Sequence, residues 1–262
     1  MVGIIGGTGF RPDEVEGEPE RVDTKYGPAW VQHALVAGVP VIFLPRHGPG
    51  HSVPPHRINY RANIAALQTF AVTAALASAA VGGLRVELSP GALVVVDQFL
   101  DFTKARAATF FDGEDGQVVH TDMTHPYCER LRRLLLEAGE EVHLTLVDRG
   151  TYVAAEGPRF ETAAEIRMFA SLGGDVIGMT GVPEVVLARE AGICYAAVAV
   201  VTNPGAGLTA ARLSHAEVNE VMESRRQDLL RLFAGVVPQA HADQCDCRAP
   251  SQPPAHTPGA RA

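Results

Sequence analysis

The chain has little cysteine, no excess of basic charge and no long apolar run. Cysteine occurs four times in 262 residues, and Cys128 and Cys194 lie in apolar segments, which favours buried thiols in a reducing cytosol. Acidic residues outnumber basic ones by 30 to 22, for a net charge of -8. This balance argues against a general nucleic-acid binder, which needs a basic face. No apolar run is long enough to span a membrane.

The ends of the chain also lack several common signals. The N-terminus has neither a basic stretch nor a cleavage site, so no signal peptide is expected. Cys245 and Cys247 form a Cys-Asp-Cys, and two cysteines cannot complete a tetrahedral zinc site. A redox or strained-disulfide role for this pair stays open, although surface thiols are favoured. Residues 239–262 have few apolar anchors, and we expect a disordered tail there.

What is present predicts one large α/β domain over residues 1–238. The chain is 47% hydrophobic and 20% charged, as in ordinary soluble enzymes. Short apolar runs alternate with segments of helical spacing, which predicts a mixed, mostly parallel central sheet flanked by helices. We expect strands at 2–5, 40–44, 93–96, 175–178 and 194–201, one or two strands in 144–155, and helices at 57–68, 129–139, 162–172, 183–191 and from Ser214 onward.

Three expected strand or helix ends carry groups suited to an anion. Gly6-Gly7-Thr8-Gly9 follows the first strand and offers backbone N–H groups and a hydroxyl. Arg46 and His47 end a second strand, and Thr180 precedes the helix that begins at Pro183, where the helix dipole favours negative charge. The Gly-rich turn is neither a P-loop nor a dinucleotide fingerprint, because the required spacing is missing. Together these ends predict a phosphate pocket at the carboxyl edge of the sheet.

A second group of residues suits a purine with a 6-oxo group. Phe160 offers a ring for stacking, and the adjacent Glu161 can accept a hydrogen bond from N1–H. Asn203 ends a long apolar strand, and its amide suits O6 and N7. An alternative for Phe160 is a core residue at a helix start, and one for Asn203 is a turn residue before Pro204.

In wording and order, these segments resemble the trimeric purine nucleoside phosphorylases and methylthioadenosine phosphorylases. The resemblance runs from about Val2 to Pro238 and includes Glu-Gly-Pro-Arg-Phe-Glu at 156–161, Gly-Met-Thr-Gly-Val-Pro-Glu at 178–184 and Val-Val-Thr-Asn at 200–203. It also implies that the Ala-rich segment 71–80 is a strand, whereas helix propensity alone favours a helix.

The resemblance implies a role for each site residue. The phosphate contacts would be Thr8, Arg46, His47, Ala80 and Thr180. The base-specific pair, Glu161 and Asn203, matches the 6-oxopurine branch, because adenine-specific relatives carry an acid in place of the asparagine. One position departs from the pattern: Ala79 stands where family members usually carry Thr or Asn. A side-chain contact to phosphate would then be lost or moved to Ser78.

The sugar site gives two opposing indications. Met179 matches the residue that packs on the ribose. His215 matches a histidine that hydrogen-bonds the 5′-hydroxyl in purine nucleoside phosphorylases, where methylthio-specific relatives carry an apolar residue. His120 matches a segment that enters the neighbouring subunit's site, and there the methylthio-active members carry histidine. The 5′ group therefore stays open.

The sequence thus predicts an enzyme that cleaves 6-oxopurine nucleosides with orthophosphate, yielding the base and ribose 1-phosphate. Arg46, Glu161 and Asn203 would carry the catalysis, with phosphate as a co-substrate and neither cofactor nor metal. The expected assembly is a cytoplasmic homotrimer with no nucleic-acid or membrane partner. The alternatives are phosphorolysis of 5′-methylthioinosine or methylthioadenosine, and a ligand-binding protein without turnover, for which Ala79 is the one indication.

Overall fold

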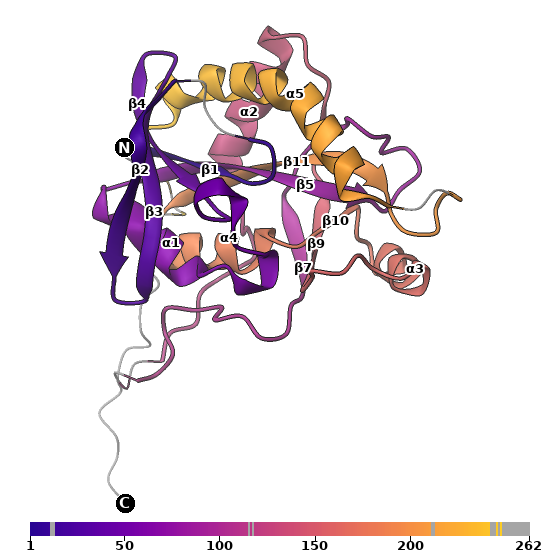
Figure 1. Cartoon of the computed structure of the whole chain (residues 1–262), viewed down its shortest axis with the longest axis horizontal. Helices are drawn as coiled ribbons and strands as arrows, with labels where there is room; N and C mark the ends of the chain where they lie inside the picture. The colour runs from indigo at the N-terminus through magenta and orange to yellow at the C-terminus, as the bar shows by residue number, and fades with distance from the viewer. Residues whose placement is uncertain are drawn as a thin grey trace, which may run out of the picture.

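The structure is a computed structural model of the chain, and it describes residues 1–10, 14–114, 116, 118–210, 213–241, 245 and 247. It confirms the α/β class: one mixed sheet is covered by helices on both faces (Figure 1). Every strand and helix expected from the sequence is present within a few residues of its expected bounds. None of the helices in the described part of the chain is long and apolar enough to cross a membrane.

The sheet has eleven strands. Eight of them run in the order β2-β3-β4-β1-β5-β10-β9-β7, while β11 pairs with β5 and β6, and β6 pairs with β8. Pairings are parallel except for β2–β3, β3–β4, β5–β10 and β6–β11. The strands are β1 (Val2–Gly6), β2 (Glu14–Thr24), β3 (Gly27–Val36), β4 (Val39–Pro45), β5 (Ala74–Gly83), β6 (Leu93–Val95), β7 (Gln98–Phe102), β8 (Leu146–Asp148), β9 (Thr151–Ala155), β10 (Val176–Gly178) and β11 (Cys194–Pro204).

Helices cover the sheet on both sides. Helices α1 (Tyr60–Thr69) and α4 (Gly181–Glu190) pack into one apolar cluster, and α2 (Glu129–Glu141) and α5 (His215–Val236) pack into another. The short α3 (Ala163–Ser171) joins a third, smaller cluster with β9 and β10. Each cluster is built from the inward face of its strands, because successive strand residues point to opposite sides.

Strand β5 shows this alternation, and its packing explains why this Ala-rich segment is a strand. Ala75, Ala77 and Ala79 face the cluster of α1 and α4, whereas Ala74 and Leu76 face the cluster of α2 and α5. The strand lies between β1 and β11, which are both parallel to it. Small residues on both faces let helices approach the sheet closely, so tertiary packing overrides the helix propensity of the alanines.

Three strands were not among the expected elements: β2, β3 and β7. Strands β2 and β3 form an antiparallel hairpin whose register shifts between Glu16 and Glu20. Buried positions on β3 fall at Ala29 and Val31, then at Ala34 and Val36. The break in the two-residue period removes the alternation that identifies a half-buried strand.

The topology brings distant segments to one edge. Strands β4, β1, β5 and β11 are neighbours and run in the same direction. Their carboxyl ends therefore lie side by side, and in open α/β sheets ligands bind at that edge. Thr8 and Arg46 follow β1 and β4, and Asn203 is the last residue but one of β11; the sequence proposed all three for one site.

Candidate functional site

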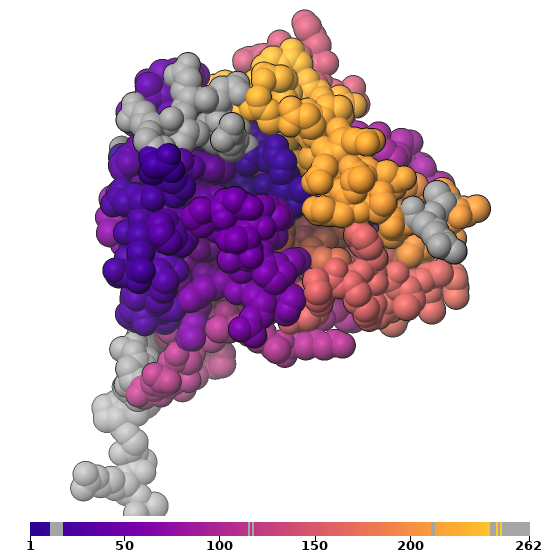
Figure 2. All heavy atoms as spheres, in the orientation of Figure 1, coloured from indigo at the N-terminus to yellow at the C-terminus, as the bar shows by residue number. Residues whose placement is uncertain are grey.

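A single pocket at this edge contains almost every proposed site residue. Its lining includes Thr8, Arg46, His47, Ala80, Phe160, Glu161, Met179, Thr180, Asn203 and His215. Figure 2 shows the surface hollowed where the loop after β4 meets α5 and the segment leading into α3. The pocket spans about 950 Å³ when the solvent in its open mouth is included. His120 alone lies elsewhere, on an exposed part of the connection between β7 and α2.

The anion end of the pocket is centred on the buried Arg46. Its Nε and Nη2 donate to the two oxygens of Glu184 at 2.5 and 2.6 Å, and its Nη1 donates to the carbonyl of Ser78 at 2.9 Å. Tyr195 donates its hydroxyl to the same carboxylate at 2.6 Å. Burial alone would lower the pKa of Arg46, but the adjacent carboxylate outweighs it and raises that pKa. Arg46 is therefore a fixed, permanently charged group.

Three of the five guanidinium N–H groups are used in this way, so one on Nη1 and one on Nη2 are left for a ligand. Gly7, from the turn after β1, lies against the same group: a Cβ at Gly7 would sit 2.7 Å from Nη1 of Arg46. The glycine is therefore needed for close approach of the turn to the arginine, and Thr8 follows at the pocket wall.

His47 is a neutral imidazole beside the arginine. Its Nδ1 is 2.9 Å from the carbonyl of Val53, which can only accept, so Nδ1 carries the proton and Nε2 is the acceptor. Burial, followed by the charge of Arg46, lowers the pKa of His47 to about 3. The ring stacks on His51 with centroids 4.1 Å apart. The anion end thus pairs fixed donors with one acceptor.

Thr180 reaches the pocket, but the helix start behind it differs from the expectation. The backbone N–H groups of Thr180 and Gly181 both donate to the hydroxyl of Tyr152, at 3.1 and 3.2 Å. The Thr180 side chain makes no capping bond to helix α4. Tyr152 therefore takes up two backbone N–H donors at the start of α4.

Of the residues around Ala79, where the sequence departs from the family pattern, only some reach the pocket. Ala80 lines the pocket, while Ala79 is 5% exposed and packs against the cluster of α1 and α4. Ser78 is fully buried, and its hydroxyl has no partner among the described residues. Neither Ser78 nor Ala79 is part of the pocket wall.

The opposite end of the pocket carries Phe160 and Glu161, just before helix α3. Phe160 is 39% exposed, so it is not the core residue that the alternative reading would require. Burial raises the pKa of Glu161, with a smaller contribution from Glu165. Thr162 and Glu165 form a reciprocal capping box that fixes the start of α3 and therefore the position of Glu161.

Asn203 is aimed by an irregularity in β11. The register with β5 shifts between Val201 and Asn203, so Thr202 is the extra residue of a bulge. The Thr202 hydroxyl lies 2.9 Å from the side-chain Oδ1 of Asn203 and 3.1 Å from the carbonyl of Val81, and it can donate to either. Asn203 donates one amide N–H to the carbonyl of Pro204 at 2.9 Å. The second amide N–H remains available for a ligand.

The middle of the pocket carries Met179 and His215. Met179 follows β10, and its backbone carbonyl lies 3.4 Å from the hydroxyl of Tyr60. His215 is the first residue of α5, where Ser214 caps the helix through the backbone N–H of Glu217. This cap sets the first turn of α5 at the pocket mouth.

Sequence reasoning missed three residues that organise the site: Glu184, Thr202 and Tyr152. Glu184 belonged to a quoted motif, but its ion pair joins positions 138 residues apart. A buried acid in an apolar helix is a usable signal, because such a residue needs a partner. Thr202 and Tyr152 gave no such signal, since their roles depend on the bulge and on the start of α4.

Comparison with known proteins identifies the sequence family. A family model described as "Phosphorylase superfamily" matches residues 1–238. A protein of Dictyoglomus turgidum described as "Probable 6-oxopurine nucleoside phosphorylase" is 50% identical, covering 94% of this chain and 95% of its own. The 6-oxopurine nucleoside phosphorylase of Pyrococcus furiosus is 45% identical, over 94% of this chain and 96% of its own.

Two further relatives bear on the 5′ group and the fold. A probable S-methyl-5′-thioinosine phosphorylase of Methanopyrus kandleri is 49% identical, over 88% of this chain and 90% of its own. The structure of a methylthioadenosine phosphorylase of Schistosoma mansoni, in complex with adenine, superposes with a TM-score of 0.86 at 34% identity. That likeness covers 91% of this chain and 90% of the Schistosoma chain.

Proposed function

Because the chain belongs to the phosphorylase superfamily, we propose that it cleaves 6-oxopurine nucleosides such as inosine with orthophosphate. The products are the free purine and ribose 1-phosphate, as expected of an enzyme of purine salvage. The observation that carries the proposal is that Glu161 and Asn203 share one pocket with Arg46, Thr8 and Thr180. Residues that suit the edge of a 6-oxopurine and residues that suit an anion therefore line the same cavity. These are the two kinds of group that the activity named for the related 6-oxopurine nucleoside phosphorylases requires.

The reaction joins a phosphate oxygen to the anomeric carbon while the bond from that carbon to purine N9 breaks. The bonding electrons leave with the purine, which takes up the one proton that hydrogen phosphate gives up. The sugar passes through an oxocarbenium-like state, as in glycoside hydrolysis. Phosphate held by Thr8, Ala80, Thr180, His47 and the two free N–H groups of Arg46 stabilises that positive charge.

Base selection follows from the two polar groups at the other end. The ionised Glu161 accepts N1–H of a 6-oxopurine, and the free amide N–H of Asn203 donates to N7 or O6. Phe160 stacks on the ring, and negative charge on the leaving purine is supported by Asn203. The pair acts by position and electrostatics, without a covalent intermediate on the protein.

The test is turnover of inosine and adenosine, each with and without phosphate. We expect phosphate-dependent release of hypoxanthine and a kcat/KM for adenosine lower by about tenfold or more, since an unpaired buried polar group costs about 1–3 kcal/mol. Asn203→Asp should shift preference towards adenosine. Asn219→Asp adds the same charge on the exposed face of α5 and should leave the ratio unchanged. Equal kcat/KM for both nucleosides would refute the assignment, and binding without any turnover would establish the ligand-binding alternative.

A second candidate is phosphorolysis of 5′-methylthioinosine. It is favoured by the 49% identity to the probable S-methyl-5′-thioinosine phosphorylase of Methanopyrus kandleri and by a histidine at position 120. Inosine, methylthioinosine and methylthioadenosine compared at equal concentration separate the candidates, because both Glu161 and Asn203 disfavour the adenine base. A higher kcat/KM for methylthioinosine than for inosine would make it the physiological substrate.

We further infer a homotrimer that acts in the cytoplasm. Within the described part of residues 103–128, the chain forms neither helix nor strand, and Val118 is 59% exposed near the exposed His120. Long connections without regular structure usually serve function, and an exposed apolar side chain suits a subunit contact. The cysteines are free thiols, as in a reducing compartment. Light scattering should give three chains per particle, and an active monomer would refute the assembly.

A further inference from the structure

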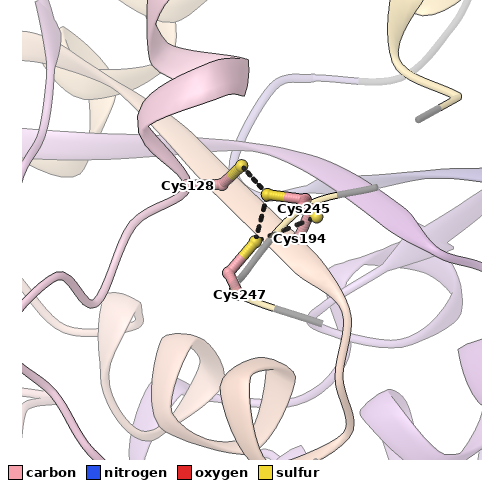
Figure 3. A group of neighbouring side chains, drawn as sticks. All are labelled: Cys128, Cys194, Cys245 and Cys247. Atoms are coloured by element: carbon pink, nitrogen blue, oxygen red, sulfur yellow. Dashed lines mark hydrogen bonds between the residues drawn. The ribbon is translucent and has the colours of Figure 1, made fainter. Parts of the chain in front are cut away.

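All four cysteines of the chain meet at one place far from the pocket. Cys128 is the residue before helix α2, Cys194 begins strand β11, and Cys245 and Cys247 belong to the C-terminal segment. Their four sulfur atoms all lie within 4.8 Å of one another. In Figure 3 the side chains converge from three separate parts of the chain on a common centre. The tail pair therefore gains the two further ligands that the sequence alone did not provide.

The spacing of the sulfurs fits a tetrahedral metal site. Neighbouring Sγ atoms are 3.6 Å apart for Cys128 and Cys245, 3.0 Å for Cys194 and Cys247, and 2.9 Å for Cys245 and Cys247. Four thiolates at about 2.3 Å from a zinc ion are about 3.8 Å from one another. These three distances lie below that value, and no two of the four sulfur atoms are more than 4.8 Å apart. A disulfide, in contrast, brings two sulfurs to about 2.05 Å, and all four cysteines are free.

Three of the four cysteines are buried, and Cys245 is partly exposed. Cys128, Cys194 and Cys247 are 3%, 1% and 9% exposed, and all three belong to the apolar cluster of α2 and α5.

The segment that carries the tail cysteines is itself attached to the domain. It leaves α5 through the short 3-10 helix η3 (Val237–Gln239), and Ala240 is fully buried. Arg130 donates from Nη1 to the carbonyl of Gln239 at 3.1 Å and from Nη2 to that of Ala240 at 2.7 Å. Most of residues 239–262 lie outside the described part of the chain, but these contacts lead the tail towards the cluster.

We propose that Cys128, Cys194, Cys245 and Cys247 bind one Zn²⁺ as a tetrathiolate and so fix the C-terminal segment to the sheet. Each thiol releases one proton on binding, the zinc keeps its charge, and no electron is transferred. Four protein ligands leave no open position, so the role is structural. Nine residues of strand separate Cys194 from Asn203, about 30 Å at the usual rise, and the ion therefore does not touch the nucleoside.

The first test is the metal content of the untagged full chain, purified without chelator and analysed by elemental mass spectrometry. We expect about one zinc per chain, and about 0.1 or less in a Cys245→Ser/Cys247→Ser double variant, because two ligands alone hold zinc weakly. Replacing zinc by Co²⁺ should give the visible absorption of a tetrahedral thiolate site. The tail cysteines are chosen for substitution because they lie outside the helices and strands of the domain.

The control is Val237→Thr, a buried change in the same apolar cluster that removes no ligand. It should lower Tm while retaining about one zinc per chain. The double cysteine variant should lose both zinc and thermal stability and keep the wild-type kcat/KM at a temperature below its Tm. Three results would overturn the proposal: iron as the main metal, four metal-free reduced thiols, or an intact mass lowered by about four hydrogens, which means two disulfides.

Discussion

Glu184 binds Arg46 through both carboxylate oxygens, and both side chains are about 1% exposed. The ion pair leaves the guanidinium one fixed orientation with two free N–H groups at the pocket. A buried pair of this kind contributes little net stability, but removing one partner leaves an uncompensated charge. Glu184 therefore acts as a positioning residue for the proposed phosphate site, and the charge that it balances can also be balanced by the ligand.

Glu184→Gln should destabilise the protein by about 3 kcal/mol in the absence of phosphate. Saturating phosphate should raise Tm more in the variant than in the wild type, because the anion balances the positive charge of Arg46. The matched control is Glu190→Gln on the same helix: Glu190 binds Thr109 and the backbone of Phe110 and should show no extra rescue. Equal phosphate shifts in all three proteins would refute the role of Glu184.

Thr202→Val should lower kcat/KM for inosine by about 1 kcal/mol in transition-state free energy, since the amide of Asn203 loses the hydroxyl beside its oxygen. Thr202→Ser restores the hydroxyl and should recover most of the rate. The preference for inosine over adenosine should fall with the valine variant alone. If serine and valine behave alike, Thr202 acts through strand packing instead.

The rate with inosine should fall on the acid side at a higher pH than an ordinary glutamate would give. Burial raises the pKa of Glu161 above its usual 4.5. The carboxylate that accepts N1–H is present above the raised pKa and is lost as the pH falls through it. Glu161→Gln should remove this acid limb along with most of the activity. Glu165→Gln should keep it, because Arg159 and the backbone of Thr162 lower the pKa of Glu165 to about 2.

His47 should let the site distinguish phosphate from sulfate. Its neutral Nε2 is an acceptor, since Nδ1 donates to Val53 and the pKa of the ring is lowered to about 3. Hydrogen phosphate carries an O–H that can donate to Nε2, whereas sulfate at neutral pH has none. Sulfate should inhibit with a constant at least about tenfold weaker than the Kd for phosphate. The glutamine in the His47→Gln variant can donate from its amide, so the ratio of the sulfate inhibition constant to the phosphate Kd should fall. An unchanged ratio would contradict the role of Nε2 as an acceptor.

His215→Leu tests the 5′ group. The imidazole of His215, at the first turn of α5, can hydrogen-bond a 5′-hydroxyl but gains nothing from a thioether. The change should lower kcat/KM for inosine by about 1–2 kcal/mol and leave methylthioinosine unchanged or improved. His33→Leu, on the exposed face of β3, should affect neither substrate. An equal loss with both substrates would make His215 structural and favour the methylthio substrate.

The sequence by itself determined the order of most elements and the identity of the groups in the pocket. Periodic apolar runs specify strands and helices locally, and motifs at the carboxyl ends of strands β1, β4 and β11 supplied Thr8, Arg46 and Asn203. The sequence did not predict the hairpin of β2 and β3, because a register shift breaks its alternation of buried and exposed residues. The Ala-rich β5 required the family resemblance, since its own propensity favours a helix.

Only the tertiary structure decided how those groups are held and what lies beside them. The pairing of Arg46 with Glu184, the bulge at Thr202 and the use of the α4 start by Tyr152 join residues that are distant in sequence or depend on local irregularity. The same holds for the cysteine cluster, where α2, β11 and the C-terminal segment each supply ligands. Local periodicity specifies elements because it reflects short-range geometry, whereas such contacts arise only when packing of the whole sheet fixes which ends meet.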